Sequence, residues 1–236
     1  MPYRRLPNTD QARLRAMQAA LNKAAGKSPA DMPFAQKTFL ELQAFYPIFL
    51  QSVNQYTLTK NKQAVAGKHL LEQFKMARLY VSHFIQVLTF CIQRGELKSA
   101  SRSLLGLNEH EKSIPDLGTE QQLLEWGEKV IKGEENRMAQ GGTRIYNPGI
   151  AMVKVKYERF VEAYNSHKDL LTITQRNLDK VAHLREKADN LIVAVWNDVE
   201  AKFADLEPER RRNVCTEFGI VYFFRRNEKE LVESNE

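Results

Sequence analysis

The chain is poor in the residues that break helices and in those that carry redox or metal chemistry. Its 236 residues include 11 glycines, 8 prolines and 2 cysteines. So few glycines and prolines argue against a loop-rich β protein. Cys91 and Cys215 lie far apart in the sequence, and neither has a second cysteine two positions away, as many metal sites do. We therefore expect two unpaired thiols, with a disulfide as the less favoured alternative.

Long apolar runs and the short motifs of familiar enzymes are also missing. No stretch approaches about 18 uninterrupted apolar residues, and the first residues lack the apolar core of a signal peptide. We therefore expect no membrane span and a cytoplasmic protein. The phosphate-binding loop, the dinucleotide fingerprint, the Gly-x-Ser-x-Gly elbow and the Glu-x-x-His pairs of di-iron bundles are absent. We predict no catalytic, cofactor-binding or metal-binding residues, and an enzyme without familiar motifs stays an open alternative.

What the sequence does have is a sustained helical pattern. The run from Ile150 to Glu207 contains neither glycine nor proline, and its apolar residues recur at steps of three and four. Residues 39–56 and 70–91 repeat this spacing. It keeps apolar side chains on one face of an α-helix and is typical of helical bundles and coiled coils. The sequence therefore predicts an all-α fold.

The order of the helices is predicted from the interruptions of this pattern. The polar segment Thr59–Gln63 lies between two apolar stripes, which predicts a tight turn and an antiparallel helical hairpin over 33–94. Pro47 falls inside the first stripe and predicts a kink or a break near residue 46.

A faint internal similarity extends the prediction to the second half of the chain. Residues 33–59 and 148–174 are similar at an offset of 115 positions, and chance convergence explains this as well as a duplication does. If the similarity is real, residues 148–207 form a second hairpin that turns near Gln175–Asn177, which we favour narrowly over one long helix. The expected fold is an antiparallel four-helix-type bundle of two long hairpins in a single domain, 1–236. The paired positions include Phe45 with Phe160 and Thr59 with Thr174.

Shorter elements complete the predicted organisation. A first helix is expected from about residue 10 to residue 25. Residues 95–147 begin with a long irregular stretch and continue as a helix that opens at a capping box of Thr119 and Gln122. The tail, 208–236, is expected to form a short helix, then a strand over Phe218–Phe224, and Arg144–Tyr146 is the expected partner of that strand.

Charge is unevenly distributed along the chain. Residues 1–98 contain 14 Lys and Arg against 5 Asp and Glu, whereas residues 99–236 contain 21 against 24. A basic half suits nucleic acid or an anionic surface. Its charges are scattered singly, however, which favours a solvated helix surface. The tail 208–236 has six basic and six acidic residues, so its arginines are also expected to be solvated.

Several stretches together resemble a family of uncharacterised helical proteins from Bacteroidetes. The resemblance spans nearly the whole chain and implies a bacterial, cytoplasmic protein, with no activity or functional residues to carry over. The stretches are Tyr3–Asp10, Tyr80–Leu88 with Arg94–Glu96, Trp126–Glu128 with Lys132–Glu135, and Glu217–Arg226.

The leading hypothesis for function is a non-enzymatic interaction or scaffold protein that presents helix faces to a protein partner or to a second copy of itself. Nucleic-acid binding through the basic first half is the alternative, and a small-molecule or metal site in the bundle core is a third, less favoured one. Besides the 99–118 loop, the residues predicted to form an interaction surface are Tyr80, His83, Trp126, Arg210, Arg211 and Arg212.

Overall fold

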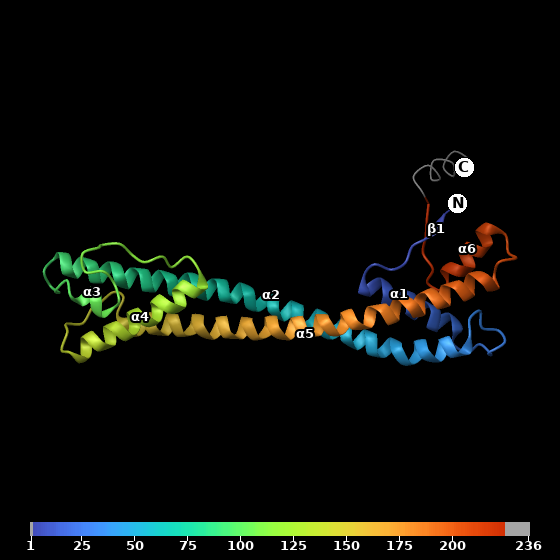
Figure 1. Ribbon diagram of the computed structural model, residues 1–236, viewed down its shortest axis with the longest axis horizontal. Helices are drawn as coiled ribbons and strands as arrows, with labels where there is room; N and C mark the ends of the chain where they lie inside the picture. Colours follow the sequence, from blue (N-terminus) through green and yellow to red (C-terminus); the bar gives the residue numbers. More distant parts are fainter. Residues whose placement is uncertain (1, 225–236) are drawn as a thin grey trace. The chain divides into compact units, whose positions relative to one another are not determined.

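A computed structural model describes residues 2–224, and apart from one two-stranded sheet every regular element of this part is a helix (Figure 1). The all-α prediction is therefore confirmed. The elements in chain order are β1 (Tyr3–Arg4), α1 (Asp10–Ala24), α2 (Gln36–Gln93), α3 (Ser101–Leu104), α4 (Glu120–Ala139), α5 (Ile150–Lys202), α6 (Pro208–Thr216) and β2 (Tyr222–Phe223).

The chain divides into two compact units. Unit 1 contains the described residues up to Thr59 and those from Thr174 onward, and unit 2 contains Lys60–Ile173. Helices α2 and α5 each contribute residues to both units. Because both long helices run through the two units, this division does not test the prediction of a single domain.

The predicted turns inside the long segments are wrong. Helix α2 is a single helix of 58 residues that continues through Pro47 and Thr59–Gln63, and α5 is a single helix of 53 residues that continues through Gln175–Asn177. Lysine, glutamine and asparagine continue a helix at a cost of only a few tenths of a kcal/mol each. Neither glycine nor proline lies between residues 48 and 66, or between 150 and 202, so no helix-breaking residue lies at either predicted turn. Two long helices replace the two hairpins.

In unit 1 the long helices run antiparallel, because contacts pair rising residue numbers on α2 with falling numbers on α5. Helix α1 is held to α5 by two ion pairs, Arg13 with Asp189 at 2.8 Å and Arg185 with Asp10 at 2.9 Å. The contacts between the long helices are Ala35 (just before α2) with Asp198, Phe45 with Lys187, and Thr59 with Asn177.

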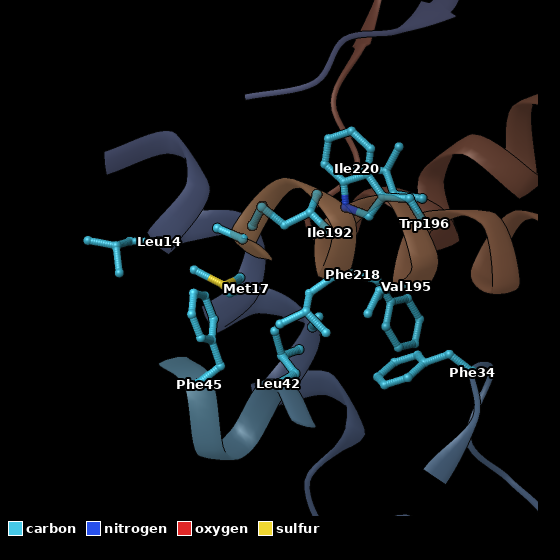
Figure 2. Packing of buried hydrophobic residues seen from close by; sticks show 14 of the residues in the cluster. Leu14, Met17, Phe34, Leu42, Phe45, Ile192, Val195, Trp196, Phe218 and Ile220 are labelled. Carbon is cyan, nitrogen blue, oxygen red and sulfur yellow. The ribbon is translucent and has the colours of Figure 1, made fainter. Parts of the chain in front are cut away.

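The core of unit 1 lies between α1, α2 and α5 and is closed by the segment that follows α6. Figure 2 shows side chains from all these elements in contact around one apolar centre. Among its fully or almost fully buried members are Leu14, Met17, Phe34, Leu42, Phe45, Ile192, Val195, Trp196, Phe218 and Ile220.

Unit 2 is built in a similar way, with α4 packed on the antiparallel pair of α2 and α5. Tyr157 of α5 donates a hydrogen bond to the carbonyl of Leu124 on α4, at 2.7 Å, and its ring covers Gly127. The predicted capping box at the start of α4 is confirmed. Contacts between the long helices are Gly67 with His167, Phe74 with Phe160, and Tyr80 with Lys156.

The C-terminal strand is shorter than predicted and has a different partner. Only Tyr222 and Phe223 form β2, which pairs antiparallel with β1, so that Tyr3 faces Phe223 and Arg4 faces Tyr222. The expected partner segment Arg144–Tyr146 lies in unit 2, where Ile145 is buried in the core. In the described part of the chain, no helix is both long enough and apolar enough to cross a membrane.

Candidate interaction surface

The predicted surface residues Tyr80, His83 and Trp126 all lie in unit 2 but on two helices. Tyr80 is half-buried on α2, where Lys156 Nζ lies 5.6 Å from its ring centroid, and His83 is exposed one turn further along the same helix. Trp126 lies on α4, where the Lys129 ammonium covers its ring at 4.8 Å. The structure thus places Tyr80 and His83 on one helix and gives Trp126 different neighbours.

The predicted arginine cluster lies on α6 in unit 1. Arg210 is exposed, whereas Arg211 and Arg212 are half-buried. Arg225 and Arg226, which follow the aromatic segment, lie outside the described residues.

The 99–118 loop is fixed from within by one arginine that the sequence did not single out. Arg102 is only 2% exposed, and its guanidinium donates to the carbonyls of Asn108 and Ser113 at 2.9 Å and to Thr89 Oγ1 at 2.5 Å. Burial lowers the pKa of Arg102, but a guanidinium titrates so high that it stays charged. The loop is therefore part of the packed structure of unit 2.

In unit 2, helix α2 carries a second set of regularly spaced positions besides those that face the core. The buried side of this stretch includes Leu70, Phe84 and Leu88. A separate set of positions, here called the outer stripe, also follows alternating steps of four and three and keeps to another side of the helix. The outer stripe consists of Val65, His69, Glu72, Met76, Leu79, His83, Gln86 and Phe90.

Half of the eight outer-stripe positions carry exposed apolar side chains, and the other half are polar or charged. Val65 is 69% exposed, Met76 38%, Leu79 50% and Phe90 53%. Single exposed apolar residues are ordinary, but several of them on one helix face mark an interaction site more often than chance. Sequence analysis missed the row because its members alternate with polar residues, and only the three-four spacing could have revealed it.

A shallow groove of about 430 Å³ runs beside the outer stripe, between α2 and α5 of unit 2. Helix α2 lines it with Ala66, His69 and Gln73. Its opposite wall comes from α5, through Arg159, Glu162, Ala163 and Ser166. Because His69 belongs to both the groove and the outer stripe, the two features form one continuous surface.

The cations on this part of α2 are largely unpaired. Between Lys60 and Gln93 the helix carries five basic residues and a single acidic one, Glu72. Lys62, Lys68 and Lys75 are exposed and form no ion pair with any described residue. Lys68 and Lys75 each directly precede an outer-stripe residue, which is the flanking position that selects partners by charge in coiled coils.

The possible metal ligands and the two cysteine thiols form no reactive site in the described residues. Within residues 2–224, no three His, Cys, Asp or Glu side chains gather closely enough to hold a metal ion. Cys91 and Cys215 are both buried, and both are free thiols, as predicted. Burial raises the pKa of both thiols, so neither is an activated nucleophile.

Comparisons with family models, curated proteins and solved structures return no match to this chain. Membership of the helical Bacteroidetes family therefore stays a prediction.

Proposed function

We propose that the protein is an interaction module that binds a helix of a partner protein on the outer stripe of α2. The observation that carries this proposal is the row of exposed apolar side chains at heptad spacing. An amphipathic helix presents apolar residues with the same spacing, so the two rows can interdigitate along about three heptads.

Charge favours a different protein over a second copy of this chain. Two copies would bring together two stretches that each carry five basic residues and one acidic residue. A partner helix with Asp or Glu beside its apolar row would instead pair with Lys68 and Lys75. Charged pairs at such flanking positions determine which helices associate.

The apolar contacts supply a useful binding energy. Full burial of a large apolar side chain contributes about 1.5–3 kcal/mol, and the four apolar members of the outer stripe are roughly half-exposed. Covering them therefore contributes on the order of 4 kcal/mol before ordering costs. Docking of this strength suits a reversible adaptor.

Site-specific photo-crosslinking in an extract of cells that make the protein tests the proposal. A benzoylphenylalanine replaces Leu79 in one variant and Lys37 in the control, because Lys37 lies on the same helix and its side chain is 87% exposed. We expect one discrete protein adduct from position 79 and none from position 37. Equal adduct patterns from both positions, or none from either, would contradict the proposal.

The nucleic-acid alternative makes an opposite prediction for the same surface. Phosphate contacts would depend on Lys62, Lys68 and Lys75 and weaken steeply with salt, whereas exchange of Leu79 for alanine would have little effect. A gel shift with mixed-sequence duplex DNA at low salt distinguishes the two. Binding that is lost in the three-lysine variant and kept in Leu79→Ala would replace the helix-binding proposal.

A further inference from the structure

Unit 1 contains a second concave surface that the proposed function does not use. This unit 1 groove has a volume of about 420 Å³ and lies where the N-terminal segment and the chain after α6 meet α1 and α5. It is lined by Arg5, Leu6, Pro7, Asn8, Ala12, Arg15, Ala16, Ala19, Trp196, Thr216, Gly219, Ile220, Val221 and Phe223.

The groove has an apolar base and an open apolar rim. Trp196 and Ile220 of the base are almost completely buried and belong to the core shown in Figure 2. Leu6, Val221 and Phe223 at the rim are 45%, 48% and 40% exposed. Sites for small molecules usually enclose 70–90% of their ligand. This open groove instead suits an occupant that continues past its rim, such as a polypeptide segment.

The charged groups of the groove are two arginines, Arg5 and Arg15. No acidic residue is among the lining residues. Arg4 and Arg13, from the same segment and helix, are ion-paired with Glu200 and Asp189, whereas Arg15 forms no ion pair with a described residue.

A second arginine of the groove, Arg5, is in a similar position to Arg15. Arg5 has only the face of the Phe223 ring, 5.3 Å from its Cζ, and no ion pair within residues 2–224. Two arginines without an ion pair in the described part of the chain, beside a groove with no acidic lining residue, favour an anionic ligand group.

From this combination we infer that the unit 1 groove binds an extended segment of a partner protein in which a large apolar side chain stands next to a carboxylate. The apolar side chain enters over Ile220 and Trp196, and the carboxylate lies between Arg5 and Arg15. Together with the outer stripe, this would give the protein two separate binding sites, one on each unit.

Fluorescence anisotropy with labelled ten-residue peptides tests the inference on the full chain. The probe carries one central Phe-Asp pair in a Gly-Ser background, and two matched probes carry Ala-Asp or Phe-Asn. We expect the Phe-Asp probe to bind, and each matched probe to bind at least tenfold more weakly. No binding of the Phe-Asp probe, or equal binding of all three, would overturn the inference.

Variants locate the binding site. Arg15→Gln removes one groove cation, and Ala19→Phe fills the groove without changing charge; each should weaken the Phe-Asp probe about tenfold. Arg176→Gln, which removes an exposed arginine on α5 of unit 1 outside the groove lining, is the matched control and should leave binding unchanged. If Arg15→Gln and Ala19→Phe bind like the unmodified protein, the site is elsewhere and the inference fails.

Intrinsic fluorescence gives a second readout and checks that a peptide is the occupant. The chain has two tryptophans, so Trp126→Phe leaves Trp196 as the sole emitter. The Phe-Asp probe, unlabelled, should shift the Trp196 emission in this background. If N-acetylphenylalanine amide mixed with free acetate produced the same shift at the same concentration, a small-molecule site would replace the peptide site.

Discussion

Replacing Thr174 with valine should stabilise the protein. Thr174 is buried on α5, and its hydroxyl oxygen is without a hydrogen-bond partner in the described residues. A buried polar group left unsatisfied costs about 1–3 kcal/mol, and valine and threonine have nearly equal helix propensities. Thr174→Val should therefore raise the free energy of unfolding by about 1–2 kcal/mol, or raise Tm by about 2–8 °C for a chain of this size.

The neighbouring threonine gives the opposite expectation. Thr59 Oγ1 accepts a hydrogen bond from Asn177 Nδ2 at 3.3 Å. Thr59→Val leaves that buried amide without its acceptor and should lower the free energy of unfolding by about 1–2 kcal/mol. Thr172→Val is the control, because Thr172 is exposed and its change should stay within about 0.5 kcal/mol.

Urea unfolding followed by circular dichroism measures all three variants. The opposite signs for Thr174 and Thr59 follow from burial between two continuous antiparallel helices. If the chain turned at residues 60–63 and 175–177, both threonines would lie beside solvated turns and both changes would be near zero. A neutral or destabilising Thr174→Val would therefore refute the reasoning.

Three further predictions concern other packed groups. Gly127→Ala places a Cβ 2.3 Å from the Tyr157 ring, so Tm should fall by several degrees in a thermal scan, and an unchanged Tm would argue against this packing. Glu134→Gln breaks a buried ion pair with Arg137 and should cost about 3 kcal/mol in urea unfolding; a loss below about 1 kcal/mol would mean that the pair is solvated. Burial, reinforced by its hydrogen bond to a glutamate, raises the pKa of Tyr222 above its ordinary value of about 10. The neutral Tyr222 hydroxyl therefore stabilises the folded state fully below pH of about 10, and this stabilisation is lost as the pH rises further. In Tyr222→Phe the free energy of unfolding should fall less steeply with pH above about 10. Equal slopes for the variant and the unmodified protein would contradict this.

The sequence was sufficient for the class of fold because helical periodicity is a local property. Spacing alone identified the buried faces around Phe45 and Phe160, and the capping box at Thr119 fixed the start of α4. The predicted turn at residues 59–63 is wrong because these residues are polar but none of them is a helix breaker. Absence of glycine and proline was the better signal there.

Other features depend on contacts that no sequence pattern reports. A strand of two residues such as β1 is too short to show an alternating pattern, so its pairing with β2 could not be predicted from the sequence. No sequence pattern distinguishes Arg102 from a solvated arginine, because its three hydrogen-bond acceptors are brought to it only by the fold. The positions paired by internal similarity are consistent with the packing, since Thr59 and Thr174 are both buried, but a duplication stays a prediction.

The most direct test of the central claim combines Leu79→Asp with a photoreactive residue at position 90. Leu79 is half-buried, so the substitution should lower the free energy of unfolding by only about 1–2 kcal/mol, which circular dichroism checks by showing that the variant is folded. It should nevertheless abolish the adduct formed from position 90, because a carboxylate in the outer stripe repels an acidic helix and breaks the apolar row. An undiminished adduct in the folded variant would contradict the claim that the outer stripe is the binding surface.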